Sequence, residues 1–62
     1  MLSENVKRLR EEHDLTQTEL GEKVGVTRVF IGYIEQGFKT PKLELAKRIA
    51  DVFETTIDEL MS

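Results

Sequence analysis

The chain has 62 residues and a formal net charge of −3, which allows one domain and leaves little room for the cleft of an enzyme. It contains no cysteine, which excludes disulfides and thiolate metal sites. No apolar run approaches the roughly 18 residues of a membrane span, and no hydrophobic signal segment opens the chain, so we expect a soluble cytoplasmic protein without membrane attachment.

Apolar residues recur at steps of three and four along the chain, which indicates helices, and strand-like alternation is absent. The first helix is expected to begin at about Ser3, whose side chain is a suitable N-cap, and to end at about His13. Val6 and Leu9 give it a short apolar face. Asp14 is expected to end this helix, because aspartate tolerates the left-handed backbone conformation.

The second and third helices have clear start and stop residues. Thr16 followed by Glu19 predicts a capping box at the start of the second helix, and Gly25 is expected to end it. Thr27 is the expected N-cap of the third helix, and Gly37 its C-terminal glycine. Their apolar side chains have helical spacing and are expected in the core: Leu20, Val24, Val26, Ile31 and Ile34.

A fourth helix is predicted from Thr40 as N-cap and Pro41 as first helical residue, because proline is favourable in the first turn. Its residues with core spacing, up to its end near Phe53, are Leu43, Ala46, Ile49, Ala50 and Phe53. Thr56 and Glu59 predict a second capping box for a short fifth helix that carries Ile57 and Leu60. We therefore expect an all-helical single domain over residues 1–62.

Residues 17–36 are predicted to form a helix-turn-helix. Two short helices joined only by Gly25 and Val26 must cross at a steep angle. Gly25 allows a positive φ in the turn, and Gly21 has no side chain where the two helix backbones approach each other. The joint spacing of these glycines and apolar residues over twenty positions is a fairly specific signal for this arrangement.

A wider pattern of residues extends this helix-turn-helix over nearly the whole chain. It consists of residues 16–28 (TQTELGEKVGVTR), Ile31, residues 34–37 (IEQG) and Pro41, with Val6 and residues 9–10 upstream and Ala46, residues 49–50 and residues 57–60 downstream. The pattern resembles the Cro/repressor-type (XRE-like) helix-turn-helix family. The resemblance implies a compact five-helix, lambda-repressor-like domain that binds double-stranded DNA, with the second helix of the motif in the major groove.

The resemblance also implies a set of DNA contacts. They are expected at Arg10, Gln17, Thr27, Arg28, Val29, Gly32, Tyr33, Lys39 and Lys42. Arg28 is the expected base reader because its guanidinium matches the two acceptors of guanine, and Val29 is suited to a thymine methyl group. Gln17 lies at a helix start, where backbone N–H groups attract phosphate. Arg10 and Glu35 match an ion pair that ties the first helix to the third, expected to contribute only about 0–1 kcal/mol if exposed.

Several positions depart from the family pattern. Gly21 stands where alanine is usual, Val29 and Phe30 stand where polar or small residues are common, and Gly32 removes one reading side chain. Glu54 stands where glycine or asparagine usually ends the fourth helix, which predicts strain there. The reading face is therefore poor in hydrogen-bonding groups, and we expect recognition to depend on few hydrogen bonds, on apolar contact and on DNA shape.

Charge is unevenly distributed. Residues 16–42 have a net charge of +1, whereas residues 43–62 have −3. Phosphate attraction is therefore expected to be local and confined to the middle of the chain.

The leading functional hypothesis is a sequence-specific transcriptional regulator, a repressor of phage, plasmid or controller type that binds a palindromic operator as a homodimer. Apolar residues toward the C-terminal end are the candidate dimer surface: Leu45, Val52, Ile57, Leu60 and Met61. The alternative is an antitoxin-like or anti-repressor-like protein-interaction module that uses an exposed patch of Val29, Phe30 and Phe38. Because His13 is the only histidine, we expect no metal, and we expect no cofactor, small-molecule ligand or enzymatic activity.

Overall fold

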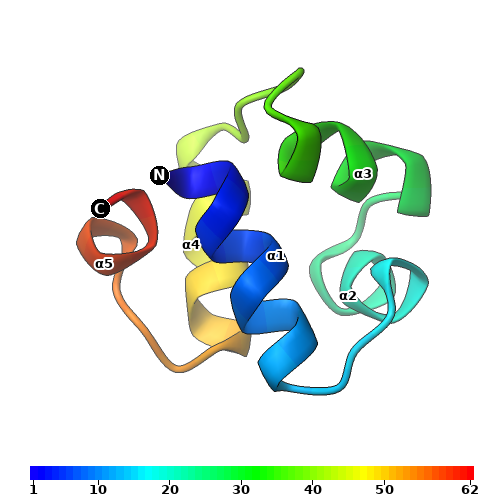
Figure 1. The fold of residues 1–62 in the computed structure, drawn as a ribbon, viewed down its shortest axis with the longest axis horizontal. Coiled ribbons are helices and arrows are strands. Elements are labelled where there is room, and N and C mark those ends of the chain that lie inside the picture. The colour runs from blue at the N-terminus through cyan, green and yellow to red at the C-terminus, as the bar shows by residue number, and fades with distance from the viewer.

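The computed structural model describes residues 1–62 and contains five α-helices and no strand (Figure 1). The helices are α1 (Leu2–Glu12), α2 (Gln17–Val24), α3 (Arg28–Gln36), α4 (Leu43–Val52) and α5 (Ile57–Met61). The predicted all-α, five-helix fold is confirmed. The longest helix, α1, has 11 residues, and none of the five qualifies as a membrane-spanning segment.

Helices α1 and α4 lie at the centre of the molecule. In Figure 1, α1 crosses in front of α4, with α2 and α3 on one side and α5 on the other. Helix α3 packs against both α1 and α2, and α5 packs against both α1 and α4. This arrangement leaves α3 at an outer edge of the molecule, with one of its sides directed away from the other helices.

A cluster of buried apolar side chains joins the five helices. Its members are Val6, Leu20, Val24, Ile31, Ile34, Ile49, Ala50, Phe53 and Leu60. The core predicted for α2, α3 and α4 is confirmed, except that Leu43 is 72% exposed at the start of α4. Leu60 is fully buried in the cluster, so the prediction that it lies on a dimer surface is wrong.

The predicted caps of α2 and α3 are confirmed. The Thr16 hydroxyl accepts a hydrogen bond from the Glu19 N–H at 3.0 Å, and the Thr16 N–H donates to the Glu19 carboxylate at 2.8 Å. The Thr27 hydroxyl accepts from the N–H of Phe30 at 3.2 Å. Gly25 ends α2 in the left-handed conformation, with φ 83°. The hydroxyl groups of Thr16 and Thr27 thus satisfy N–H groups that the first turn of a helix leaves unpaired.

The predicted N-caps of α1 and α4, Ser3 and Thr40, are wrong. Helix α1 begins before Ser3, because the N–H of Asn5 donates to the carbonyl oxygen of Met1 and closes a turn there. Helix α4 begins only at Leu43, and Pro41 lies in the preceding loop, where it is buried. Packing of the proline ring against the molecule thus holds the loop and delays the first turn.

Two helix ends behave as predicted, and one cap forms only in part. Asp14 and Glu54 both have positive φ, 56° and 55°, which is costly for a residue with a side chain. At α5, the Thr56 hydroxyl accepts from the Glu59 N–H at 3.1 Å, but the Glu59 carboxylate accepts from the hydroxyl of Thr55 instead of the Thr56 N–H. The predicted second capping box is therefore wrong in its reciprocal half.

The capping box of α2 predicts a contribution to acid sensitivity. The hydrogen bond from the Thr16 backbone, and then that of its side chain, lower the pKa of Glu19 below its ordinary value of 4.5. The folded state thus favours the charged carboxylate, and its stabilisation is complete above the ordinary pKa and is lost as the pH falls through the lowered one. We expect Glu19→Gln, measured by thermal unfolding from about pH 6 to about pH 3, to lose less stability on acidification than the wild type. The matched control is Glu22→Gln on the same helix, and a profile for Glu19→Gln that parallels the wild type would refute this assignment.

Candidate functional site

Helices α2 and α3 are held together by close backbone contact at Gly21. The N–H groups of Gly25 and Val26 both donate to the Gly21 carbonyl oxygen, at 2.8 and 2.9 Å. A Cβ atom at Gly21 would lie 2.6 Å from the carbonyl oxygen of Val26. The predicted need for glycine at positions 21 and 25 is confirmed. The close contact at Gly21 fixes how α3 projects from the molecule.

We expect Gly21→Ala to destabilise the protein by about 1–2 kcal/mol, because the new methyl group forces the turn to shift. The sign is diagnostic, since alanine is a better helix former than glycine by about 1 kcal/mol. Urea denaturation is used to compare Gly21→Ala with Thr18→Ala. The second variant lies at an exposed position of the same helix, so it shows the effect of an added alanine without the clash at the turn. A more stable Gly21→Ala protein would contradict this account.

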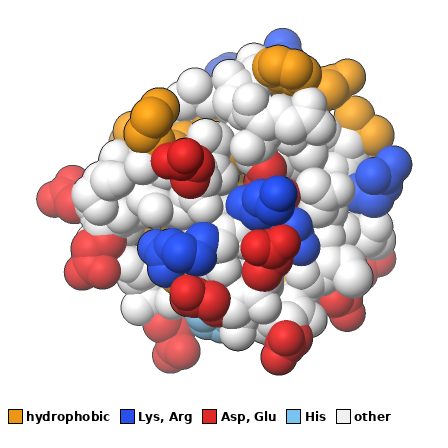
Figure 2. Space-filling model, in the orientation of Figure 1, with side chains coloured by type: hydrophobic (Ala, Val, Ile, Leu, Met, Phe, Trp, Pro, Cys, Tyr) orange, Lys and Arg blue, Asp and Glu red, His pale blue; other side chains and the backbone are white.

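The outward side of α3 presents a mixed surface. Thr27, Arg28, Val29 and Tyr33 are exposed, with Val29 50% and Tyr33 41% accessible. The Tyr33 ring lies 6.3 Å from the ring of Phe38 in the following loop, centroid to centroid. Figure 2 shows hydrophobic side chains along the upper edge of the molecule, the edge that α3 occupies in Figure 1. Arg28 is the one charged group on this part of the helix.

Gly32 does not belong to the outward side. It is buried, and a Cβ atom there would lie 3.8 Å from the side-chain nitrogen of Gln17. The prediction of Gly32 as an outward-facing DNA contact is therefore wrong: it follows Arg28 by one helical turn, but the Gln17 side chain of α2 lies over it. The missing side chain leaves space that the Gln17 amide approaches.

A hydrogen-bonded cluster of Arg10, Gln17 and Glu35 joins the first three helices. The Arg10 Nε and Nη2 atoms donate to the two carboxylate oxygens of Glu35, at 2.6 and 3.1 Å. The Gln17 side-chain amide donates to the same carboxylate at 3.1 Å, and Arg10 Nη1 donates to the Leu15 carbonyl oxygen at 2.8 Å. The hydrogen bond to Glu35 raises the pKa of the Arg10 guanidinium above its ordinary value. The predicted ion pair is confirmed.

This ion pair is largely buried rather than exposed. The Arg10 side chain is 11% accessible and that of Glu35 only 4%. Three of the five N–H groups of the guanidinium donate to protein oxygens, and little of the side chain is accessible, which argues against the predicted phosphate contact of Arg10. Its role in the structure is to position α3 relative to α1. The Gln17 hydrogen bond to Glu35 was not predicted from the sequence, where nothing marks Gln17 as facing α3.

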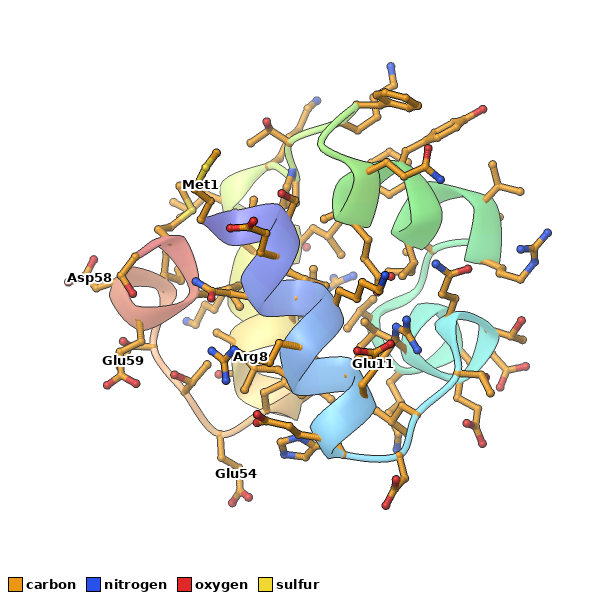
Figure 3. All side chains as sticks on the ribbon, viewed as in Figure 1. Met1, Arg8, Glu11, Glu54, Asp58 and Glu59 are labelled. Carbon is orange, nitrogen blue, oxygen red and sulfur yellow. The ribbon has the colours of Figure 1, made fainter.

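Positive side chains without partners surround the outward side of α3. Arg28, Lys39 and Lys42 are exposed and form no salt bridge, whereas Arg8 and Arg48 pair with carboxylates on their own helices. The acidic side chains Glu54, Asp58 and Glu59 lie on the other side of the molecule, at and near α5 (Figure 3). Three further exposed lysines, Lys7, Lys23 and Lys47, also form no salt bridge, so the feature that marks the α3 side is the absence of acidic side chains among Arg28, Lys39 and Lys42 rather than unpaired charge alone.

The residues predicted as a dimer surface do not form one exposed patch. Met61 is 51% accessible, while Val52 and Ile57 are partly buried against the core. Leu45 is also partly buried, and it lines a groove between α3 and α4 together with Val26 and Phe30. The sequence contains no signal for this groove, because the approach of Leu45 to Phe30 depends on the course of the loop over residues 37–42.

The structure assigns His13 a packing role. Its Nδ1 atom lies 2.8 Å from the Leu9 carbonyl oxygen, and its ring centroid lies 5.0 Å from that of Phe53. No group of three or more histidine, aspartate or glutamate side chains is arranged to hold a metal ion. His13 therefore closes the end of α1 against the end of α4.

The chain is similar in sequence and in structure to known helix-turn-helix proteins. The model of the family described as "Helix-turn-helix" matches residues 6–60. An uncharacterised HTH-type transcriptional regulator of Archaeoglobus fulgidus is 42% identical over 55 residues, which cover 89% of this chain and 79% of the relative. The cryptic phage CTXphi transcriptional repressor RstR of Vibrio cholerae is 36% identical over 63 residues, 100% of this chain and 56% of the repressor. Among solved structures, the P22 c2 repressor in complex with a synthetic operator superposes with a TM-score of 0.93 at 25% identity, covering 97% of this chain and 91% of that one.

Proposed function

The chain belongs to the Cro/repressor-type (XRE-like) helix-turn-helix family, and we propose that residues 1–62 form one DNA-binding domain of a transcriptional regulator of the repressor type. The observation that carries the proposal is the exposed side of α3, where an unpaired Arg28 projects from a helix fixed by Gly21 and the buried Arg10–Glu35 ion pair. A regulator of this kind acts by binding, without catalysis, in the cytoplasm where its operator lies.

We assign base reading to the outward side of α3 in the major groove. Arg28 has five N–H donors and no competing carboxylate, so it is free to donate to the O6 and N7 acceptors of a guanine. Thr27 uses its hydroxyl oxygen to accept from Phe30, which leaves the hydroxyl hydrogen available for a phosphate. Tyr33, 41% exposed, has its hydroxyl available for a base edge or a phosphate.

Phosphate contacts are assigned on both sides of α3. Gln17 occupies the first position of α2, where free backbone N–H groups and the helix dipole favour an anion. One hydrogen of its amide is bound to Glu35, and the second remains for a phosphate oxygen. Lys39 and Lys42 supply two unpaired charges in the loop that follows α3. These contacts set the register of the protein on DNA, and α3 supplies sequence discrimination.

The expected operator is palindromic. One domain of this size reads only a few base pairs, so two chains on half-sites about one helical turn apart provide useful affinity. Of the residues predicted for a dimer surface, Met61 is the exposed one, and we propose that the two chains associate around it. Selection of bound duplexes from a random DNA pool, combined with the solution mass of the free and bound protein, tests the proposal. We expect a palindromic consensus bound by two chains, and the absence of any enriched sequence would refute it.

Protein binding through the α3 surface is the second candidate function, because Val29 and Phe38 are 50% and 70% exposed. A salt titration separates the two candidates. Binding to DNA weakens steeply with salt, since each neutralised phosphate releases counterions, whereas apolar association hardly responds. A salt-insensitive complex with a protein, and no DNA complex, would favour the second candidate.

The exposed Val29 side chain on α3 predicts that the affinity for DNA depends on thymine methyl groups. Val29 is 50% exposed and has no hydrogen-bonding group, so its contribution to a base contact is apolar. We expect replacement of contacted thymines by uracil, which removes only the methyl group, to weaken binding by about 1 kcal/mol. Val29→Ala should lose most of this discrimination. The control is Leu43→Ala, exposed at the start of α4, and equal discrimination by Val29→Ala and the wild type would overturn the contact.

A further inference from the structure

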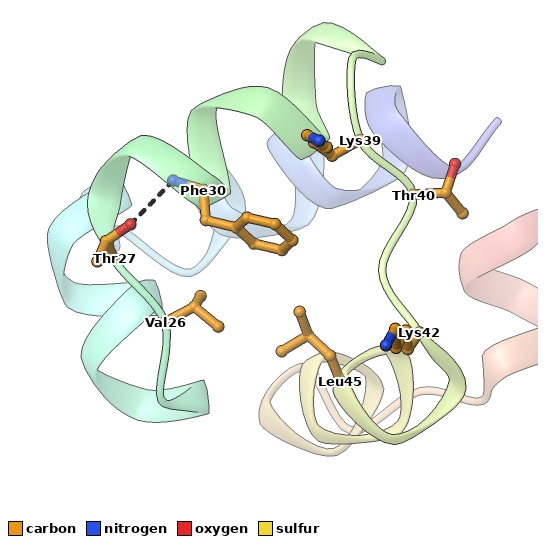
Figure 4. Close-up of a pocket in the computed structure, with 7 residues that line it drawn as sticks. All are labelled: Val26, Thr27, Phe30, Lys39, Thr40, Lys42 and Leu45. Atoms are coloured by element: carbon orange, nitrogen blue, oxygen red, sulfur yellow. Dashed lines mark hydrogen bonds between the residues drawn. The ribbon is translucent and has the colours of Figure 1, made fainter.

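A groove of about 580 Å³ opens between α3 and α4, beside the proposed DNA-binding surface. In Figure 4 the side chains of Val26, Phe30 and Leu45 point toward one another and form its floor, while Lys39 and Lys42 belong to the loop that borders it. The same three apolar side chains pack on their inner sides against the core. The floor is therefore anchored in the folded structure.

The chemistry of the groove is apolar in the centre and positive along one border. Its lining residues are Val26, Thr27, Phe30, Lys39, Thr40, Lys42 and Leu45, with no carboxylate among them. Neither lysine forms a salt bridge, and the Thr27 hydroxyl accepts from the Phe30 N–H at its own helix start. The groove thus combines an unfilled apolar floor with two uncompensated charges, in a chain whose net charge is −3.

We propose that this groove is the docking site of an acidic peptide segment of a partner protein, which inserts one bulky apolar side chain between Val26, Phe30 and Leu45 while its carboxylates meet Lys39 and Lys42. An apolar groove that takes anchor side chains from a peptide is a common mode of recognition. A DNA backbone matches the lysines but brings no apolar group to the floor. A segment that is both acidic and apolar complements both parts of the groove.

Occupation of the groove has a consequence for regulation, which rests on the proposed function. Thr27, Lys39 and Lys42 line the groove and are also assigned to DNA. One set of side chains cannot hold a carboxylate and a phosphate together. The peptide therefore acts as an anti-repressor element that competes with the operator.

Selection of short random peptides displayed on phage, against the full 62-residue chain, tests the docking site without a known partner. We expect enriched peptides to contain acidic residues around one large apolar residue. Their affinity, measured by fluorescence anisotropy, should fall about tenfold or more in the double variant Lys39→Glu with Lys42→Glu. Lys47→Glu, an exposed lysine of α4 outside the groove, is the charge control.

A second pair of variants tests the apolar floor. Leu45→Ala should lower the affinity for the selected peptide about tenfold. Leu43→Ala, at an exposed position of the same helix outside the groove, should leave that affinity unchanged. Circular dichroism checks that each variant is folded. Enrichment of peptides without acidic residues, or equal binding to the lysine double variant and the wild type, would overturn the proposal.

Competition with the selected operator duplex separates this inference from the proposed function. We expect the peptide to displace the duplex. If no duplex can be selected, the proposed function fails while peptide binding is still scored directly. If the peptide binds without displacing the duplex, the proposed competition is refuted. If Leu45→Ala lowers the affinity for the duplex but not for the peptide, the groove belongs to the DNA interface and the proposed docking site is wrong.

Discussion

Replacing Glu35 with alanine is expected to destabilise the protein by about 3–5 kcal/mol. The substitution leaves the guanidinium of Arg10, whose side chain is 11% accessible, as a buried charge without its partner. It also removes the acceptor of the Gln17 amide. Because a chain of this size has a total stability of about 3–9 kcal/mol, the substitution should remove between about a third and all of the free energy of unfolding, as circular dichroism with urea titration will measure.

Two further variants make this prediction specific. Gln36→Ala, at the neighbouring exposed position of α3, should change stability by less than about 0.5 kcal/mol. The double variant Arg10→Met with Glu35→Leu replaces both charges by apolar groups of similar size, and should be more stable than Glu35→Ala despite carrying two substitutions. A loss below about 1 kcal/mol for Glu35→Ala would mean that the pair behaves as an exposed salt bridge.

Arg28→Ala should weaken binding to the selected operator by about 1–3 kcal/mol, which is about 5-fold to 150-fold. The side chain is exposed and free of salt bridges, so the substitution removes a base contact without disturbing the fold. Discrimination should be relaxed at one base pair of each half-site, which distinguishes a base reader from a phosphate contact. Anisotropy measurements with the consensus duplex and single-base-pair variants supply the comparison.

The controls for Arg28 are basic residues elsewhere. Lys47→Ala on α4 lies outside the proposed interface and should leave affinity unchanged. Lys39→Ala, at a proposed phosphate contact, should lower the affinity for all duplexes by a similar factor. It should also reduce the slope of log affinity against log salt concentration by about the amount that one phosphate contact contributes. If Arg28→Ala lowers affinity uniformly for every duplex, Arg28 contacts a phosphate and the assignment of base reading to it is wrong.

Local sequence signals accounted for the scaffold in detail. Thr16 and Glu19 form the expected capping box, Gly25 the expected left-handed turn, and Gly21 the expected close approach. These features depend on residues within a few positions of one another, so the chemistry of each residue type is sufficient. The same logic failed at Pro41, where burial in the loop outweighs the preference of proline for a first helical turn.

The functional surface was less predictable, because it depends on how distant segments meet. Arg10 and Glu35 were expected to pair, but the burial that changes their energetic role comes from the packing of α1 against α3. Gly32 was predicted to be exposed, and it is buried because the Gln17 side chain of another helix lies over it. The groove at Leu45 arises from the loop between α3 and α4, whose path no local pattern specifies.

The proposal that the outward side of α3 carries DNA binding is tested most directly by nuclear magnetic resonance. The uniformly ¹⁵N-labelled protein is titrated with the selected duplex, and the backbone amide shifts are followed residue by residue. The account predicts the largest changes at Gln17, at residues 27–33 and at Lys39, with smaller changes in α5, where the two bound chains are proposed to associate. Large changes confined to α5 and the start of α1, with α3 unchanged, would contradict it.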